Sequence, residues 1–346
     1  MSQTEELIEA LDSRVRRREE RRAFFKVALG AAAVGAGAFA VATPAAAQAV
    51  TDNDILNFAL NLEYLEAQFY SYAAFGTGIA ANLQTGVTTS GPQGAVVIGT
   101  TNPARQVNFS GDPLVGQYAR EIAADEIAHV AFLRTALAAA AVAQPAINIS
   151  GDANGPFTAA AKAAGVDLTA SGGVFDPYAN PNNFLLGSFI FEDVGVTAYK
   201  GSAALLTSKV FLEAAAGILA VEAYHSSIVR TSLYARGMAT PALQLVETTE
   251  KISAARDLLD GTPADDPVRG IGADDDQGIA PVTISGALLP ASGTGSNIVP
   301  LNSNGLAYSR TAAQVLNIVY LNKAAVTMGG FFPAGVNGTI RTSAAN

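Results

Sequence analysis

Apolar residues recur at intervals of three and four along much of the chain, a spacing that places them on one face of a helix. The first such stretch has its apolar positions at Ile55, Phe58, Leu62, Leu65 and Phe69. It predicts a helix that Asp52 or Asp54 caps and that ends near Ala74. The sequence Gly111-Asp112-Pro113 then predicts the start of a second helix, with Pro in the first turn, that runs to about Ala143.

The same spacing predicts further helices later in the chain. Pro181 begins a helix that runs to about residue 206, and Thr207-Ser208 separates it from the next one. That helix is expected to run to about Arg236, with Gly237 just past its end. A fifth helix is predicted over residues 241–259, and a last amphipathic segment over residues 311–328.

The connections between these helices are rich in Gly, Thr, Asn and Pro. Residues 77–111 contain one predicted short strand at 95–98, and residues 145–181 contain one predicted short helix at 157–164. Residues 260–305 are acidic and then rich in Gly, Ser and Pro, so they are expected to be irregular. The pattern as a whole predicts an all-α chain with two long, loop-rich connections.

The first 49 residues have the pattern of an export signal. A basic region that contains Arg21 and Arg22 precedes a short apolar core and an Ala-x-Ala site, which together predict a secretory signal. The apolar core is short for a membrane span, which needs about 20 residues. The pair Arg21-Arg22, followed by Phe24 and Lys26, resembles a twin-arginine signal. Glu20 departs from that pattern, because Ser or Thr is usual there.

We therefore expect the export machinery to recognise residues 1–49 and to transport the protein in its folded form. Cleavage is expected after Ala47 or Ala49, which would place the mature protein in the periplasm or outside the cell. A retained N-terminal anchor is the alternative.

Composition limits the chemistry that the chain can perform. A net charge of −9 disfavours a nucleic-acid partner, because binding to phosphate groups needs a basic surface. The chain has no cysteine, which excludes thiol nucleophiles, disulfides and thiolate metal sites. Any metal ion must therefore be bound by oxygen and imidazole nitrogen, which suit iron, manganese or zinc.

Both histidines of the chain lie three residues after a glutamate, as Glu126-x-x-His129 and Glu222-x-x-His225. Three residues are nearly one helical turn, so each pair projects from one helix face. A two-metal helical bundle needs this pair on two helices and one further glutamate on each of the other two. Glu63 and Glu192 are the candidates, because each lies in an otherwise apolar helical run.

The spacing of these residues supports the assignment independently. Glu192 and Glu222 each lie 15 residues from Thr207, at the break between their helices. Glu63 lies 13 residues before Gly76, and Glu126 lies 14 residues after Asp112. In antiparallel helices with a rise of about 1.5 Å per residue, the four carboxylates are expected at similar heights.

This set of residues resembles the ferritin-like superfamily, and more closely its exported members grouped with plant desiccation-related proteins. The segments that carry the closer resemblance are Leu56–Glu63, Phe191–Gly195, Arg310–Leu316 and Gly329–Pro333. The resemblance implies a ferritin-like antiparallel four-helix bundle with a long crossover and a fifth helix over residues 50–260. Residues 261–346 are expected to form an irregular tail with one amphipathic helix that packs on the bundle.

The resemblance also implies roles for individual residues. Two iron or two manganese ions would be bound, with Glu63 and Glu192 as terminal ligands and Glu126 and Glu222 as bridges. His129 and His225 would each bind one ion. Tyrosines seven residues after each terminal glutamate are expected to hydrogen-bond across the bundle to ligand carboxylates: Tyr70 and Tyr199.

Other acidic residues receive weaker interpretations. Glu66 competes with Glu63 but is expected to lie outside the ligand set or at the surface. Glu121, Asp125 and Asp193 are expected to be solvated or to support the ligands. Residues 265–266 and 274–276 are acidic, but they lack the spacing of an EF-hand and are expected to form a solvated loop.

Several functions remain open at this point. The first is two-electron chemistry with O2 or H2O2, as in a ferroxidase, a peroxidase or a catalase, in the setting of oxidative stress. The second is a non-catalytic, metal-stabilised envelope protein related to stress or desiccation. A hollow storage cage is disfavoured, because residues 77–111, 145–181 and the C-terminal tail would crowd the surfaces that a cage packs. The sequence leaves open the choice of metal, the physiological substrate and whether the chain forms a homo-oligomer.

Overall fold

The computed structural model describes residues 50–272, 275–285 and 290–346. The predicted export signal, with Arg21 and Arg22, lies outside the described residues, and so does Asp274. Within the described part of the chain, every helix is too short or too polar to cross a membrane.

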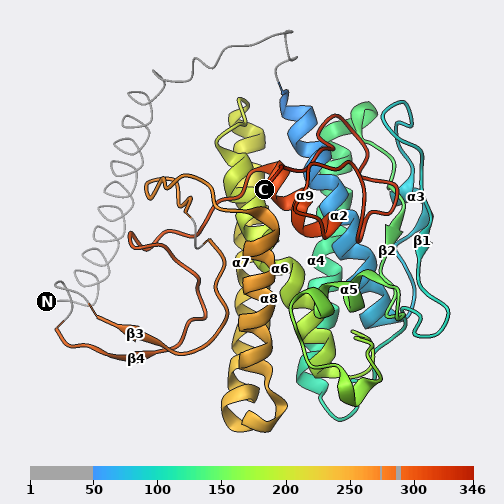
Figure 1. The fold of residues 1–346 in the computed structure, drawn as a ribbon. Helices are drawn as coiled ribbons and strands as arrows, with labels where there is room; N and C mark the ends of the chain where they lie inside the picture. The colour runs from blue at the N-terminus through green and yellow to red at the C-terminus, as the bar shows by residue number, and fades with distance from the viewer. Residues whose placement is uncertain (1–49, 273–274, 286–289) are drawn as a thin grey trace, which may run out of the picture. The chain divides into compact units, whose positions relative to one another are not determined.

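Four long helices lie side by side and form an antiparallel bundle (Figure 1): α2 (Asp52–Phe75), α4 (Pro113–Leu137), α6 (Pro181–Ala203) and α7 (Lys209–Ala239). Helix α2 packs mainly on α4, and α6 packs mainly on α7. Residues 138–180 cross from the first pair to the second. The structure therefore confirms the predicted all-α bundle and its long crossover.

The N-cap of helix α2 lies one residue before Asp52, the earlier of the two predicted caps. Thr51 is the N-cap: its hydroxyl accepts the Asp54 N–H, and the Asp54 carboxylate accepts the Thr51 N–H. This reciprocal pair is a capping box. Asp52 has a different role, because its carboxylate accepts the backbone N–H groups of Thr207 and Ser208. It thereby fastens the α6–α7 turn to the start of α2.

Three helices end at positions that differ from the prediction. Helix α4 stops at Leu137 instead of Ala143, because Asn57 on α2 bonds the backbone of residues 140 and 142. Helix α7 continues through Gly237, whose missing side chain leaves room for Val246. The tail helix α9 (Ala312–Tyr320) stops well before residue 328. Leu321 there adopts a left-handed φ of 54°.

The connections contain short elements. Helix α3 (Ala81–Gln84) and strand β1 (Val96–Val97) lie between α2 and α4. The crossover contains η1 (Ala138–Ala140), β2 (Ile147–Asn148), α5 (Pro156–Ala163) and η2 (Thr169–Ser171). Strand β1 pairs in parallel with β2, and the tail strands β3 (Val282–Ile284) and β4 (Gly293–Gly295) form an antiparallel pair. Strand β1 and helix α5 agree closely with the predicted strand and short helix, whereas the other short elements were not predicted.

The segment after the bundle covers α6. The turn η3 (Pro241–Leu243) leads into helix α8 (Leu245–Asp260), and both α8 and α9 contact α6. Phe331 from the tail packs its ring 4.9 Å from Phe191 on α6 and 5.1 Å from Phe157 on α5. Helix α6, like α2, is therefore buried on nearly all sides, whereas α4 and α7 each keep an exposed face.

Candidate metal centre

The six residues predicted as ligands come together in the middle of the bundle. Each is buried, although the helices that carry them come from opposite halves of the domain. Because the Glu-x-x-His spacing is close to one helical turn, both members of each pair face inward. The residues are Glu63 on α2, Glu126 and His129 on α4, Glu192 on α6, and Glu222 and His225 on α7.

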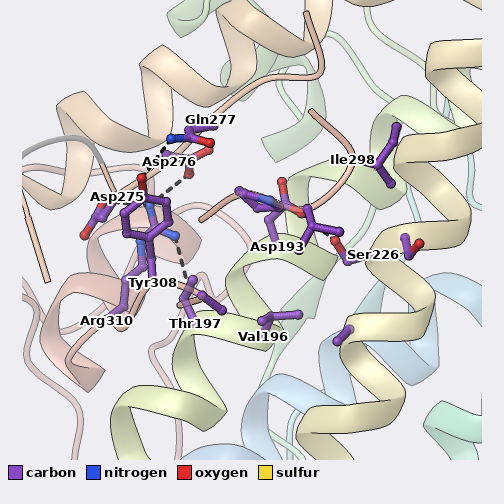
Figure 2. Close-up of a pocket in the computed structure, with 15 residues that line it drawn as sticks. Asp193, Val196, Thr197, Ser226, Asp275, Asp276, Gln277, Ile298, Tyr308 and Arg310 are labelled. Atoms are coloured by element: carbon purple, nitrogen blue, oxygen red, sulfur yellow. Dashed lines mark hydrogen bonds and ion pairs between the residues drawn. The ribbon is translucent and has the colours of Figure 1, made fainter. Parts of the chain in front are cut away.

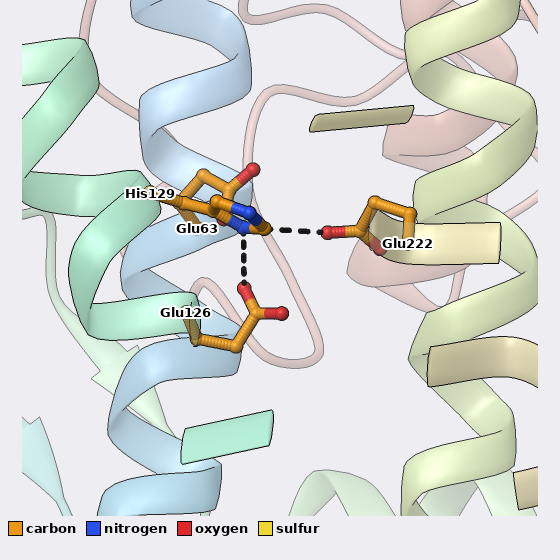
Figure 3. A group of neighbouring side chains, drawn as sticks. All are labelled: Glu63, Glu126, His129 and Glu222. Atoms are coloured by element: carbon orange, nitrogen blue, oxygen red, sulfur yellow. Dashed lines mark hydrogen bonds and ion pairs between the residues drawn. The ribbon is translucent and has the colours of Figure 1, made fainter. Parts of the chain in front are cut away.

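His129 lies at the centre of one half of the cluster, as Figure 3 shows. Its Nδ1 atom is 3.2 Å from an oxygen of Glu63, 3.5 Å from Glu126 and 3.8 Å from Glu222. One ligand atom from each of these four residues lies within 4.8 Å of the others. Four atoms at such spacings can surround a single metal ion.

His225 forms the second half with the other oxygen of Glu126. Its Nδ1 atom is 3.0 Å from Glu126 Oε1 and 3.7 Å from Glu192 Oε2. Glu126 therefore presents one oxygen to each histidine, which is the arrangement that a bridging carboxylate needs. The Nε2 atom of His225 is 3.1 Å from Asp125 at the surface, so Asp125 can fix the orientation of the ring.

Two tyrosines link the halves by reciprocal hydrogen bonds. Tyr70 on α2 donates to Glu192 on α6, and Tyr199 on α6 donates to Glu63 on α2. Both rings are buried, and burial raises the pKa of each hydroxyl well above its usual value. The tyrosines therefore remain protonated, and each donates a hydrogen bond to one carboxylate oxygen, of Glu192 or of Glu63.

Glu66, which was expected outside the ligand set or at the surface, lies beside the predicted ligands and not at the surface. It is buried, and one of its oxygens lies within 4.8 Å of oxygens of Glu192 and Glu222. The signal for this was its spacing of three residues from Glu63 in an apolar helix. Gly195 on α6 makes room for the Glu222 carboxylate, because any side chain at this position would collide with Glu222 Oε2.

Burial and mutual repulsion change the ionisation of the cluster. Burial raises the pKa of Glu63 to about 7 and that of Glu192 to about 8. Burial, followed by the charge of Glu126, raises the pKa of Glu222 well above its ordinary value. Burial alone would lower the pKa of both histidines, but nearby carboxylates outweigh it. The pKa of His129 is raised to about 11, next to Glu63 and Glu126, and that of His225 to about 9.

The cluster has the properties of a site that needs cations. Five carboxylates face two histidines in a buried space. Several inward atoms form no hydrogen bond of regular geometry, although Glu126 and His225 form an ion pair: Glu66 Oε2, both oxygens of Glu126, Glu192 Oε2, Glu222 Oε2 and His225 Nδ1. Buried polar atoms are rarely left unpaired, and buried charges need a counter-charge. Two divalent ions would supply both, so the residues present fit a two-metal centre.

The other acidic residues lie outside this cluster. Glu121 is exposed, and Asp125 is 44% exposed beside His225. Asp193, which was expected to be solvated or to support the ligands, is not solvated: it is buried and contacts Arg230 at 2.7 Å and Arg256 at 3.0 Å. It therefore belongs to a network of ion pairs behind α6.

The predicted solvated loop at 274–276 is also wrong for Asp275 and Asp276. Both are buried: Asp276 contacts Arg256 and Arg310, and Asp275 contacts Arg310. Figure 2 shows Arg310 beside these two aspartates, at the edge of a cavity of about 80 Å³ that Ser226 also lines. No local pattern signalled this network, because its arginines come from three separate segments.

The fold and the cluster together define a ferritin-like bundle, and comparison with known families agrees. Residues 51–235 match the family model described as the ferritin-like domain. This match spans all four bundle helices up to the last turns of α7, so the chain belongs to the ferritin-like domain family.

Two curated relatives share most of the length of the chain. The desiccation-related protein PCC13-62 of Craterostigma plantagineum is 30% identical over 269 residues, which are 77% of this chain and 76% of that protein. The ferritin-like catalase Nec2 of Nesocodon mauritianus is 27% identical over 292 residues, or 84% of each chain. No solved structure gives a significant match.

Proposed function

We propose that the protein binds two iron or two manganese ions in the carboxylate and histidine cluster and reacts with H2O2 or O2. The observation that carries this proposal is Glu126, whose two oxygens each face a different histidine inside a cluster of unpaired carboxylate atoms. Such ions would supply two-electron redox chemistry at a site with oxygen and nitrogen ligands.

Each residue of the cluster would have its own role in binding these ions. Glu63 and Glu192 would each bind one ion, with the second oxygen held by Tyr199 or Tyr70. Glu126 and Glu222 would bridge the two ions. Glu66 would add a carboxylate on the side of Glu192 and Glu222. Asp125 would hold the His225 ring so that Nδ1 faces inward.

We favour H2O2 as the oxidant, because one relative bears the name of a catalase. The balanced reaction would convert two H2O2 into two H2O and one O2. The side chain of His129 is 10% exposed, more than the other five predicted ligands, so we propose that a small oxidant enters beside it.

The test combines metal analysis with a peroxide assay. Mass spectrometry of the native protein should find two iron or manganese ions per chain, and the manganese-loaded protein should release O2 from H2O2. Glu126→Gln should lose metal and O2 release together, whereas Glu121→Gln, on the exposed side of the same helix, should keep both. Native protein without metal, or with a single zinc ion, contradicts the proposal.

A non-catalytic function is the second candidate, supported by the relative named for desiccation and by the enclosure of the site. The tail closes the Glu66 side, where Ile318 and Val319 of α9 border a cavity of only about 10 Å³. Under this alternative the ions stabilise the bundle without turnover. A loaded protein that shows no absorbance change with H2O2 or O2, but melts at lower temperature after Glu63→Ala, would favour it.

We also propose that residues 1–49 direct export of the folded protein to the periplasm or the exterior. The basis is the sequence around Arg21 and Arg22 and the Ala-rich site that ends at Ala49. Changing both arginines to lysine should leave uncleaved precursor in the cytoplasm. Normal export of that double variant would exclude a twin-arginine signal. The number of chains in the exported protein can be measured on the same material by sedimentation.

A further inference from the structure

A second acidic cluster lies at the end of α8, and none of its members belongs to the centre described above. Asp257 and Asp260 occupy the last turn of that helix, three residues apart and thus on one face. Asp275, from the segment that follows, joins them. One oxygen from each of the three lies within 4.8 Å of the other two.

The position of this cluster in the helix is electrostatically unfavourable. The C-terminal end of a helix carries partial negative charge and favours cations, yet α8 has two aspartates and no basic residue in its last turn. Arg310 supplies one positive charge: its Nε is 2.5 Å from Asp260, and its Nη2 is 3.1 Å from Asp275. The same guanidinium also contacts Asp276 at 2.9 Å.

Counting the whole ion-pair network leaves it short of positive charge. Among the residues that the structure describes, Arg230, Arg256 and Arg310 face four buried aspartates, which leaves one more negative charge than positive charges. The buried aspartates are Asp193, Asp260, Asp275 and Asp276. A buried charge without a counter-charge is strongly unfavourable, so the network needs a further positive group.

Two carboxylate oxygens show where this positive group is expected to bind. Asp260 and Asp275 each bond Arg310 through one oxygen, while the second oxygens, Asp260 Oδ1 and Asp275 Oδ2, are buried without a hydrogen-bond partner. Both side chains have 0% exposure. Among the described residues, therefore, these two oxygens have no partner that would offset their burial.

We propose that Asp257, Asp260 and Asp275 bind a calcium ion, with water completing the coordination. Calcium prefers oxygen ligands at about 2.3–2.6 Å, so oxygens up to about 5 Å apart can share one ion. Magnesium binds at about 2.0–2.1 Å in a stricter octahedron and fits a spread of this size less well. The ion would fasten the segment at Asp275 to the end of α8.

The competing explanation is a proton shared between two carboxyl groups. Burial raises the pKa of Asp275 to about 7, so a proton on this side chain could pair the two orphaned oxygens without any metal. An asparagine at this position would imitate the protonated acid. The two explanations therefore predict different responses to calcium and to Asp275→Asn.

The experiment is calorimetric titration of CaCl2 into the protein with its iron or manganese centre loaded, alongside melting curves with and without calcium. We expect one calcium ion per chain and a rise in Tm of several degrees at millimolar calcium. Asp257→Asn and Asp260→Asn should each weaken calcium binding at least tenfold, as should Asp275→Asn. Asp265→Asn, an exposed change in the nearby acidic segment, should bind calcium normally.

Wild-type protein without a calcium response would overturn the proposal, as would equal calcium binding by wild type and Asp257→Asn. If Asp275→Asn also proved as stable as wild type in calcium-free buffer, the shared proton would be the explanation. Because the readout is calcium binding with the Glu and His centre already filled, it does not depend on whether that centre is catalytic.

Discussion

Helix α6 carries two adjacent buried acids whose charges are balanced in different ways. Asp193 points to the outer side, where Arg230 and Arg256 contact it directly and Ser226 donates a hydrogen bond. Glu192 points inward, where it meets Tyr70, His225 and other carboxylates. The outer network of Asp193 and its arginines is thus largely neutralised by the chain itself. The inner cluster of Glu192 and the other predicted metal ligands, one residue away along the helix, is not.

The two clusters differ in where their positive charge comes from. Arginines are always protonated, so ion pairs such as Asp193 with Arg230 persist without any other partner. The inner cluster instead has unpaired atoms on Glu126, Glu192 and Glu222. Its missing positive charge must come from ions or protons. The two clusters should therefore respond to different perturbations, and four experiments test this separation.

The largest effect is expected from breaking the outer network at Arg256. Its guanidinium contacts Asp193 and Asp276 and lies 4.6 Å from the ring centre of Phe189. Arg256→Met should lower the free energy of unfolding by about 3–5 kcal/mol, because it leaves buried carboxylates uncompensated. Urea unfolding should give the same loss with and without metal.

Lys251→Met, an exposed change on the same helix, is the control and should stay within about 0.5 kcal/mol of wild type. Metal loss in Arg256→Met without loss of stability would show that the two clusters are not separate.

The inner cluster should instead respond to pH through metal affinity. In the metal-free protein at pH 7, His129 and His225 hold protons, since their pKa values are about 11 and 9, and so does Glu192 at about 8. A metal ion must displace such protons, so affinity rises with pH below these values. Each displaced proton changes the affinity about tenfold per pH unit, so even a single displaced proton gives about 100-fold between pH 6 and pH 8.

This prediction is checked by manganese titration at several pH values, with the released protons counted in a weakly buffered solution. Affinity that stays constant from pH 6 to pH 8 would mean that the cluster is already deprotonated. The positive charge would then have another source.

A change beside the inner cluster should weaken metal binding without removing a ligand. Gly195→Ala places a methyl group where Glu222 Oε2 now lies, so the carboxylate must move. We expect metal affinity to fall about 10- to 100-fold, the usual effect of disturbing the support of a ligand. Gly217→Ala on α7 is the matched control, because nothing lies within 4 Å of the added atom. Equal metal affinity in the two variants would contradict the geometry.

The smallest effect is expected at Asp125, on the exposed edge of the cluster. Asp125→Asn keeps the size of the side chain but removes the charge beside His225 Nε2. Metal affinity should fall about tenfold, at the low end of the usual range, because water screens this partly exposed carboxylate. Isothermal titration with the metal ion measures this loss of affinity, and Glu121→Gln, an exposed change on the same helix, is the control. A larger loss for Glu121→Gln would exclude the assigned role.

The sequence predicted the inner cluster well because its signals are local. Glu126-x-x-His129 and Glu222-x-x-His225 each lie within one helical turn, and the register about Thr207 and Gly76 placed the remaining glutamates at the same height. The bundle was predictable for the same reason. Helical spacing and turn residues act within a few positions of one another.

The outer network was not predictable, because its members meet only after the chain has folded. Arg230 and Arg310 are far apart in the sequence, and the segment Arg310–Leu316, although it carries part of the family resemblance, gives no sign of the buried partners of Arg310. The predicted end of α4 was wrong for a similar reason. Asn57 takes up the backbone groups of residues 140 and 142, so α4 ends early despite an Ala-rich sequence that favours helix. The sequence left Glu66 either beside the ligands or at the surface, because its spacing from Glu63 does not show which side of α2 faces the other helices.

The reciprocal tyrosine bonds bear on the order in which the molecule assembles. Tyr70 and Glu192 are 122 residues apart, and Tyr199 and Glu63 are 136 residues apart. Contacts this distant cost more chain entropy to close than the turn between α6 and α7, so they form late. Neither helical hairpin alone contains more than half of the six inner residues. The six-residue cluster thus comes into existence only when the two hairpins dock, so any metal ion would be inserted as a final maturation step.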